Sequence, residues 1–336
     1  MQIVRNILKT IVILLAVVYG GLCIYAYWPF GEGVPIAELA GPDDRFIDAS
    51  GIQLRYQSWG QDRPGQPVLV FIHGFANSLQ SFQRIAPLLA DDYRVIALDM
   101  PGFGLSGKPV DHDYSNPSQA AVVADFIAAL GLNDVIIGGQ SMGGAHALHV
   151  AEMAPEVIGM ILFNPGIITT GVPAATQYFV FPLPRLAAKT FGQRDFRENF
   201  LTSSYLDPAL VTEAVMDELM LGPRSEGYIE GTTALMGYYV AGNEIDMLAN
   251  VDVPTLIVWG KEDKRKPAGE AEQLRDMIAG SRLIIVEDAA HYVHEEQPQV
   301  AAQAIIAARD FWESSQTVGD MPGAEEMLIE DFGEHE

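Results

Sequence analysis

The sequence predicts an α/β fold in which a mostly parallel sheet is covered by helices, interrupted by a helical insertion and preceded by one membrane-spanning helix. Three observations predict this architecture. Short apolar runs without alternation, typical of strands buried on both faces, recur between helical patterns along most of the chain. The stretch at 167–250 carries Phe, Tyr, Met and Pro but no convincing buried strand. A long uncharged apolar run stands near the N-terminus.

The overall composition fits one catalytic domain with an insertion. In 336 residues, hydrophobic residues make up 49%, which is enough for a large core and argues against disorder across the body. A net charge of −24 would repel nucleic-acid phosphates, so we expect no nucleic-acid partner. The single cysteine, Cys23, lies inside the apolar N-terminal run and can form neither an internal disulfide nor a cysteine-based metal site. We expect neither a metal nor an organic cofactor.

Residues 1–30 are predicted to form a retained membrane anchor. The 18 residues from Ile11 to Trp28 carry no charge and are rich in Ile, Leu and Val. A helix of that length, extended by Ile7 and Leu8, can cross the roughly 30 Å hydrocarbon core of a bilayer. A cleaved signal peptide is the alternative. It usually has an apolar stretch of about 7–15 residues and a small-x-small cleavage site, and neither is obvious in this segment.

The residues that flank the apolar run predict its orientation. Arg5 and Lys9 precede the run, and Tyr25, Tyr27 and Trp28 end it. Positive residues favour the cytoplasmic side, and amphipathic aromatic rings prefer the headgroup level. We therefore expect a single-pass protein with a cytoplasmic N-terminus. Its catalytic domain is expected on the extracytoplasmic side, which is the periplasm in a Gram-negative bacterium.

A linker at 31–45 that contains Pro and Gly leads into the first part of the core, predicted at 46–166. An antiparallel hairpin is predicted to open this core, because two alternating runs flank the turn signal Ser50-Gly51. Buried strands and helices then alternate, as βαβ crossovers require. The predicted hairpin strands are 46–49 and 53–59, the buried strands are 68–72, 95–98, 135–137 and 160–163, and the helices are 80–90, 116–130 and 145–153.

The insertion at 167–250 is predicted to be a helical cap. Strand and helix patterns resume in the second part of the core at 251–315. From 316 to 336 the chain has seven Asp or Glu and no Lys or Arg, so we expect an acidic, mobile tail. The strands predicted in the second part of the core are 255–259 and 283–286, and the helices are 269–278 and 298–314.

The motif Gly139-Gln140-Ser141-Met142-Gly143 directly follows a predicted buried strand and precedes a helix predicted from near Gly144. This is the setting of a nucleophile elbow, in which a serine sits on a strained strand-to-helix turn. Gly139 and Gly143 lack the Cβ atoms that would collide in such a turn. Ser141 is therefore the predicted nucleophile.

A serine hydroxyl needs a base to take its proton and a carboxylate to orient that base. His291 follows the last predicted strand, where its ring could reach back over the sheet edge, and His294 is its rival. Asp263 stands at the carboxyl end of the preceding strand, where a loop acid can meet the histidine. Glu262 and Asp288 are weaker alternatives. The predicted residues follow the chain order serine, acid, histidine that this kind of site uses.

The tetrahedral intermediate of acyl transfer needs backbone N–H donors for its oxyanion. One donor comes from the residue after the nucleophile and the other from the loop after an earlier strand, which correspond to Met142 and Phe75. Gly74, just before Phe75, allows the chain to turn beneath the substrate. His73 stands at a strand end, and we expect it to make a structural hydrogen bond rather than to act as the base.

Together these segments resemble the α/β-hydrolase superfamily from about Phe46 to Ser314. The resemblance implies an eight-stranded, mostly parallel sheet, a triad of Ser141, Asp263 and His291, and a cap over the active site. Among its members, the chain is similar to membrane-anchored monoacylglycerol lipases and related bacterial esterases, which also place an anchor before the hydrolase body. The residues that carry the resemblance are His73-Gly74-Phe75, Asp99 to Ser106, Gly139 to Gly144, Gly260 to Asp263, and His291 through Glu295 to Pro298.

The resemblance also limits the reaction. Members that open epoxides or remove halogen use an aspartate where this chain has Ser141, which disfavours those activities. Perhydrolases and carbon–carbon bond hydrolases keep the serine and remain alternatives, as does a non-catalytic binding protein, although such a protein typically lacks part of the triad. The favoured prediction is a membrane-anchored carboxylic-ester hydrolase that works through an acyl-serine intermediate on lipid-like esters such as monoacylglycerols. Acyl length and head group depend on the cap geometry.

Two features of the cap bear on the substrate. Its flexible and aromatic side chains either pack its core or line a slot for an acyl chain. Four basic residues stand close together in an otherwise acidic protein, and they form either a solvated helix face or a surface that contacts anionic lipid. The apolar residues are Phe179, Phe181, Phe191, Phe196, Phe200, Tyr205, Met216, Met220, Met236, Tyr238 and Tyr239, and the basic residues are Arg185, Lys189, Arg194 and Arg197.

Overall fold

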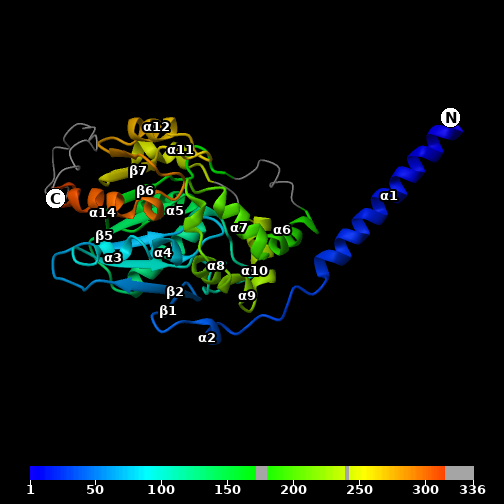
Figure 1. Cartoon of the computed structure of the whole chain (residues 1–336), viewed down its shortest axis with the longest axis horizontal. Coiled ribbons are helices and arrows are strands. Elements are labelled where there is room, and N and C mark those ends of the chain that lie inside the picture. The colour runs from blue at the N-terminus through cyan, green and yellow to red at the C-terminus, as the bar shows by residue number, and fades with distance from the viewer. Residues whose placement is uncertain (172–179, 239–241, 315–336) are drawn as a thin grey trace.

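The computed structural model describes residues 1–171, 180–238 and 242–314. Within these residues the chain forms one sheet of eight strands in the order β1-β2-β4-β3-β5-β6-β7-β8 (Figure 1). The predicted eight-stranded, mostly parallel sheet is confirmed, whereas the predicted acidic tail at 316–336 lies outside the described residues. The strands are β1 Arg45–Ala49, β2 Ile52–Trp59, β3 Val68–Ile72, β4 Arg94–Leu98, β5 Val135–Gln140, β6 Val157–Phe163, β7 Thr255–Gly260 and β8 Arg282–Val286.

The strand order creates a reversal of winding direction beside β3. The hairpin β1–β2 and the pair β2–β4 are antiparallel, and the other neighbouring pairs are parallel. From β3 the chain crosses to β4 on one side and then returns to β5 on the other side. The loops that follow β3 and β5 therefore leave the sheet in opposite directions, which opens a crevice at their carboxyl ends. The motif with Ser141 and the loop with Phe75 meet at this crevice.

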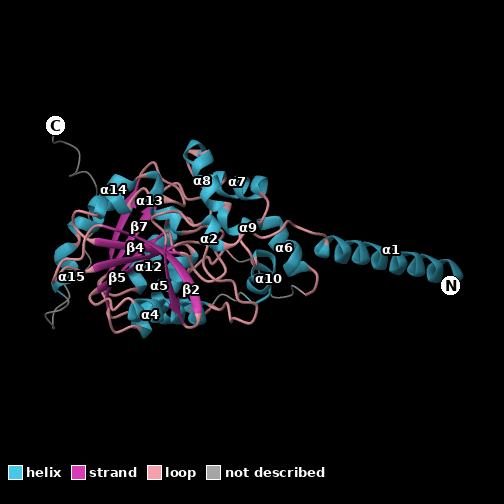
Figure 2. Ribbon diagram, turned by 90° about the horizontal axis from the view of Figure 1, so that it is seen from below, coloured by secondary structure: helices cyan, strands magenta, loops and turns pink. Residues whose placement is uncertain are grey.

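Alternate residues of β3 pack into two different cores, one on each face of the sheet. Val68, Val70 and Ile72 belong to the core that includes α4 and α5. Leu69 and Phe71 belong to the core that includes α3, α14 and α15. The helices α4 and α14 accordingly lie on opposite sides of the strands (Figure 2). The core helices are η1 Leu79–Phe82, α3 Ala86–Leu89, α4 Asn116–Ala129, α5 Met142–Met153, α12 Gly269–Met277, α13 Val293–Glu296, α14 Pro298–Ala307 and α15 Arg309–Ser314.

Three predicted helices differ from the observed ones. The helix predicted at 80–90 is two short pieces, η1 and α3, because Pro87 has no N–H and its ring would clash with a carbonyl one turn earlier in a continuous helix. The helix predicted at 298–314 is divided at Ala308, and the turn places Trp312 beneath the sheet in the space left by Gly159. The helix predicted from near Gly144 begins two residues earlier, at Met142.

The described residues between β6 and β7 form helices and no strand of the sheet. Residues 183–238 of this insertion lie at the end of the body nearest to α1 (Figure 1), whereas residues 244–247 contact the core helix α5. We keep the name cap for the insertion, and the boundaries predicted for the cap and the other domains stay a prediction. The helices of the cap are α6 Leu183–Phe191, α7 Arg194–Thr202, η3 Pro208–Leu210, α8 Glu213–Leu219, α9 Leu221–Arg224, α10 Tyr228–Tyr238, α11 Glu244–Met247 and η4 Leu248–Asn250.

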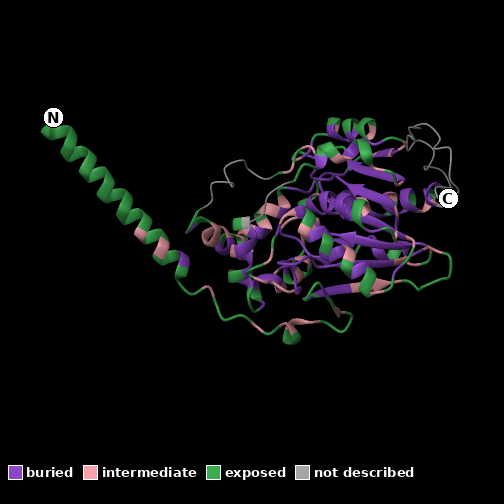
Figure 3. Ribbon diagram, turned by 180° about the vertical axis from the view of Figure 1, so that it is seen from behind, coloured by how far each residue is buried: buried purple, intermediate pink, exposed green. Residues whose placement is uncertain are grey.

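The N-terminal helix α1, Gln2–Tyr27, projects away from the body and is exposed along nearly all its length (Figure 3). It is long and apolar enough to cross a membrane. Its C-terminal end contacts α6 of the cap. The segment after it is predicted as a linker, but it contains one helical turn, α2 Ile36–Leu39, and pairs with the cap through a bridge between Val34 and Ser225.

Replacement of Phe71 by alanine tests the packing of the sheet core. The Phe71 ring is fully buried, stacks on Phe82 at 4.9 Å between ring centroids and meets Phe163 edge-on at 5.9 Å. The cavity left by Phe71→Ala should lower the free energy of unfolding by about 3–5 kcal/mol, measured by denaturant titration of the full chain in detergent. Leu88→Ala, at a position 40% exposed on α3, should change it by about 0.5 kcal/mol or less. Equal effects of the two variants would contradict the assigned core.

Candidate active site

Ser141 occupies the sharp turn between β5 and α5. Its backbone has φ 53° and ψ −117°, a strained conformation for a residue that carries a Cβ. A Cβ on Gly139 would collide with the carbonyl of Gly143, and a Cβ on Gly143 would collide with the carbonyl of Ile72. Both glycines are therefore required for the close approach of β5, α5 and the end of β3, as the motif predicts.

The loop after β3 is oriented by His73. The ring Nδ1 lies 2.7 Å from the carbonyl oxygen of Gly74, and Nε2 accepts from the amide of Met100 at 3.1 Å. His73 is fully buried between these groups, which is the structural role expected for it. The Gly74 carbonyl also accepts from the Asn77 amide at 3.3 Å. Because C=O and N–H point in opposite directions across a trans peptide, the amide of Phe75 is turned away from His73.

The amide of Met142 is oriented in the same way. The carbonyl of Ser141 accepts from Gly144 at 3.0 Å and from Gly166 at 2.7 Å, so the N–H on the other side of that peptide points away from both. Phe75, Ser141 and Met142 all line one cavity. The two amides predicted for the oxyanion thus flank the serine at a common cavity, and their role as donors stays a prediction.

The acid and the histidine lie in direct contact. Nδ1 of His291, which follows β8, is 2.8 Å from Oδ2 of Asp263, which follows β7. The same carboxylate oxygen accepts from Nδ2 of Asn164 at 2.8 Å. Its other oxygen accepts from the amides of Arg265 and Lys266 at 2.7 and 3.0 Å. Asp263 is thereby fixed in orientation, with one edge turned to the imidazole.

These contacts determine the protonation states of the pair. Burial by itself would raise the pKa of Asp263, but the hydrogen bonds from His291 and from the Lys266 and Arg265 amides outweigh burial and lower that pKa below its ordinary value. Burial lowers the pKa of His291, and the neighbouring carboxylate opposes this only in part. At neutral pH the pair is therefore an ionised aspartate and a neutral imidazole. With Nδ1–H donated to Asp263, Nε2 of His291 is left to accept a proton.

The rival residues are occupied elsewhere. Nε2 of His294 lies 2.9 Å from the hydroxyl of Ser81 in the buried core. Glu262 accepts from the amide of Ala289 and thus ties two loops together. Asp288 adopts a positive φ in the turn after β8, where its carbonyl accepts from Gln297. The structure therefore brings Asp263 and His291 together, binds the side chains of His294 and Glu262 elsewhere, and places Asp288 in a turn.

The cavity at Ser141 has a volume of about 720 Å³ and also reaches His291. Of the cap residues considered for an acyl slot, Phe191, Phe200 and Met236 line it. Phe196 packs on Phe191 instead. Tyr205 stacks on Tyr292, and Phe181 is half-exposed beside α1. Phe179 and Tyr239 lie outside the described residues.

Three groups that position His291 have no signal in the sequence. Gln140, which stands directly before Ser141 in the motif, donates from Nε2 to the carbonyl of His291 at 3.1 Å. The amide of His291 donates to the carbonyl of Ser204 in the cap at 3.2 Å. Arg265 binds the same cap turn through the carbonyl of Phe200 at 3.0 Å. The histidine loop is thus attached to both the nucleophile turn and the cap. Within residues 1–171, 180–238 and 242–314, no group of three or more His, Cys, Asp or Glu is arranged to hold a metal ion.

Comparisons with known proteins agree with this architecture. The family described as the alpha/beta hydrolase fold matches residues 67–298. The chain is 30% identical over 278 residues to 2-hydroxy-6-oxo-6-(2'-aminophenyl)hexa-2,4-dienoic acid hydrolase of Metapseudomonas resinovorans, covering 79% of this chain and 90% of that protein. It is 27% identical over 270 residues to Lipase 3 of Moraxella sp. (strain TA144), covering 78% and 82%. A solved serine hydrolase involved in carbazole degradation superposes with a TM-score of 0.66 at 27% identity, covering 81% and 98%.

The contact between Asp263 and His291 predicts a defined pH dependence. Only neutral His291 can act as a base, so kcat/KM should fall as the pH drops through its pKa, with the midpoint of this acid limb below the ordinary value of 6.5. Asp263→Asn should lower kcat by about 10⁴-fold, because the imidazole loses its orienting acceptor. Glu262→Gln is the matched control and should stay close to wild type. A limb centred above 6.5, or equal losses in both variants, would contradict the assignment.

Proposed function

Because this chain belongs to the α/β-hydrolase family, we propose that it is a membrane-anchored serine hydrolase that cleaves carboxylic esters through an acyl-serine intermediate. The observation that carries the proposal is that a serine on a strained turn and a neutral histidine line one cavity, and that an ionised aspartate is bonded to this histidine. A serine in such a turn is exposed to substrate at the top of the sheet, and the histidine and aspartate supply base and orientation.

The proposed reaction has two halves. Nε2 of His291 takes the hydroxyl proton of Ser141 as its Oγ attacks the ester carbonyl, and the amides of Phe75 and Met142 hold the resulting oxyanion. The intermediate collapses to the acyl-serine, and the imidazolium gives its proton to the departing alcohol. Water then attacks the acyl-serine with the same base, and the acid leaves with Ser141 regenerated. Asp263 stays ionised throughout and orients the ring.

The lining of the cavity supports a lipid-like substrate. Phe75, Met142, Phe191, Phe200 and Met236 surround Ser141 with flexible or aromatic apolar groups. Such a surface suits an acyl chain, and the volume of about 720 Å³ leaves room for more than a short ester. The similarity to Lipase 3 supports the same class. We propose monoacylglycerols or related acyl esters as substrates.

The N-terminal helix supports a location at a membrane. It is apolar, exposed and of sufficient length to span a bilayer. With Arg5 and Lys9 at its outer end and the aromatic residues next to the body, we propose a cytoplasmic N-terminus and a catalytic domain on the extracytoplasmic side.

A second candidate function is carbon–carbon bond hydrolysis at the same serine. It is favoured by the 30% identity to the dienoic acid hydrolase of Metapseudomonas resinovorans and by the superposition on the carbazole-degradation enzyme. A carbon–carbon hydrolase of this kind would leave simple esters almost unchanged, so a panel of esters separates the two functions.

Hydrolysis of p-nitrophenyl esters from C2 to C16 by the full chain in detergent tests the proposed function. Wild type should turn over these esters with an optimum at medium or long chains, and Ser141→Ala should lower kcat by about 10⁶-fold. Ser115→Ala is the control, because that serine stands at the N-terminus of α4, does not line the cavity and should keep full activity. Negligible turnover of the whole panel by folded wild type would favour the carbon–carbon reaction instead.

A further inference from the structure

Helix α6 of the cap has one face on the catalytic cavity and another on the membrane helix. Ala187, Thr190 and Phe191 line the cavity that contains Ser141. Arg185 and Lys189, on the other face, reach the C-terminal end of α1. A contact that the membrane helix makes with α6 is therefore about one helix diameter away from this cavity.

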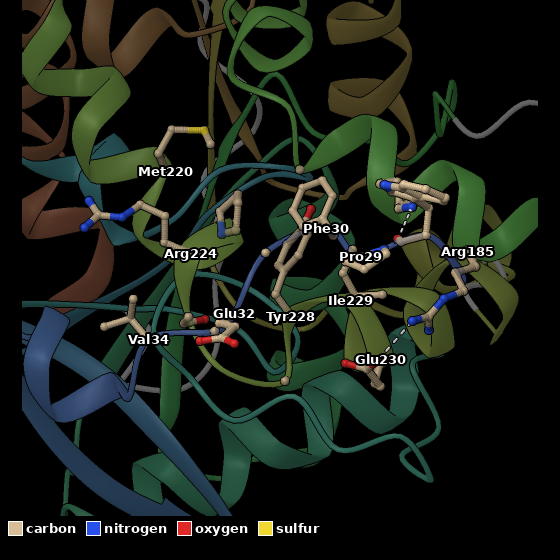
Figure 4. Close-up of a pocket in the computed structure, with 18 of the residues that line it drawn as sticks. Pro29, Phe30, Glu32, Val34, Arg185, Met220, Arg224, Tyr228, Ile229 and Glu230 are labelled. Atoms are coloured by element: carbon tan, nitrogen blue, oxygen red, sulfur yellow. Dashed lines mark hydrogen bonds and ion pairs between the residues drawn. The ribbon is translucent and has the colours of Figure 1, made fainter. Parts of the chain in front are cut away.

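The contact consists of hydrogen bonds to backbone carbonyls at the C-terminal end of α1, where the helix leaves carbonyl groups incompletely satisfied. Nε of Arg185 donates to Ala26 at 3.0 Å, and Nζ of Lys189 donates to Tyr25 at 2.6 Å and to Trp28 at 2.5 Å. Positive side chains are favourable at a helix C-terminus. Arg185 also pairs with Glu230 at 3.1 Å (Figure 4).

The four basic residues of the cap therefore do not form one solvated face, and their contact with anionic lipid stays a prediction. Arg185 and Lys189 bind α1, and each also lies over a tyrosine ring of that helix. Arg197 is buried and donates to the carbonyl of Ala76 at 2.8 Å. Arg194 forms surface ion pairs within the cap. Backbone carbonyls far away in the sequence are the acceptors, and no local pattern marks them.

Beside this contact, the chain that leads into α6 runs along the last two turns of α1. The hydroxyl of Tyr19 donates to the carbonyl of Phe181 at 3.2 Å, and the ring of Tyr27 lies 5.9 Å from the ring of Phe181. Tyr19 and Tyr27 are separated by about 12 Å along the helix axis. If Tyr25, Tyr27 and Trp28 lie at the headgroup level, Phe181 extends from that level toward the hydrocarbon.

The same short segment presents apolar side chains to the surroundings. Val180 is 70% exposed, Phe181 49% and Leu183 39%. Residues 180–184 contain two prolines and no charged residue, and Arg185 directly after them is held at the end of α1. The exposed surface of this segment continues into the exposed surface of α1, where Ile24 and Tyr27 are 67% and 63% exposed. A contiguous apolar surface of this kind marks an interaction site.

We propose that residues 180–184 are a second membrane-contact element, inserted into the lipid leaflet that surrounds the C-terminal end of α1. Its occupant is lipid, because the segment lies along a helix that is itself surrounded by lipid. The consequence is that α6, and the cavity behind it, lie against the leaflet, and acyl-lipid substrates reach Ser141 from there. This inference rests on the membrane anchoring in the proposed function.

The attachment of α1 to the cap is largely polar. A cavity of about 550 Å³ lies beside the segment after α1, with Phe30, Tyr228 and Ile229 in its wall, and Phe30 stacks on Tyr228 at 6.1 Å between ring centroids (Figure 4). The bonds from Arg185 and Lys189 therefore carry much of the contact between the anchor and the cap. Lipid around residues 180–184 would add further apolar contact to this attachment.

Site-directed fluorescence tests the insertion. In a Cys23→Ser background, an environment-sensitive fluorophore is attached to Phe181→Cys, to Val17→Cys within α1, or to Met277→Cys on α12 as the exposed control. The full chain is reconstituted into phosphatidylethanolamine and phosphatidylglycerol vesicles that carry nitroxide-labelled lipid. We expect strong quenching at 17 and 181 and little at 277.

The outcomes separate this inference from the proposed function. Quenching at 17 without quenching at 181 overturns the second contact and leaves the anchoring intact. A shielded but unquenched label at 181 means that protein, such as a second copy of the chain, covers the segment, and this also overturns the proposal. Absence of quenching at 17 shows that α1 is not in the bilayer, and both proposals about the membrane then fail.

Activity gives an independent measurement. The double variant Phe181→Asp and Leu183→Asp should lower turnover of long-chain monoacylglycerol in vesicles by about tenfold or more, because two carboxylates oppose insertion. Turnover of soluble p-nitrophenyl butyrate should stay within about twofold of wild type, since neither residue lines the cavity. Ile245→Asp, at a cap position 44% exposed on α11, should affect neither substrate. Equal losses on both substrates would overturn the proposal.

Discussion

The backbone of Ser141 is held in a conformation that costs of order 1–3 kcal/mol for a residue with a Cβ, and the proposed active site depends on it. The surrounding structure maintains this turn. The amide of Ser141 donates to the carbonyl of Phe163 at 3.1 Å, and its own carbonyl accepts from Gly144 and Gly166. These bonds tie the turn to β6 and to the loop that follows it. The same carbonyl bonds turn the amide of Met142 away from Gly144 and Gly166, so the strained turn also orients the amide that is predicted to bind the oxyanion.

The second element of the site, the histidine loop, is positioned from two directions. Gln140 in the nucleophile turn donates to the carbonyl of His291, and Ser204 in the cap accepts from the amide of His291. Arg265, two residues after the acid, binds Phe200 of the same cap turn and places its guanidinium 4.5 Å from the ring centroid. The cap therefore does more than cover the cavity, because its shape also affects where the imidazole lies. A membrane contact at the start of α6 would act on the same cap, and therefore on the groups that position His291.

Much of the fold is predictable because it follows from local patterns. The five apolar residues of β3 can be buried only on both faces of a sheet, and the predicted bounds coincide with the observed strand. The helix predicted at 80–90 is wrong because the spacing of apolar residues, on which the prediction rested, gives no information about the missing N–H of Pro87. The motif around Ser141 predicts its turn for a physical reason, since only glycine fits at the two flanking positions. Contacts between distant segments have no such signal, and the partners of Gln140 and Lys189 are backbone carbonyls that every residue carries.

The central claim is that Ser141 is a nucleophile activated by His291 in the folded, full-length protein. Labelling with a fluorophosphonate probe, followed by mass spectrometry of the digested chain, tests it most directly. The account predicts a single covalent adduct on Ser141, formed by folded protein in detergent, lost after heat denaturation and strongly slowed in His291→Ala. Absence of an adduct on folded protein, or an adduct on another serine, would contradict the claim.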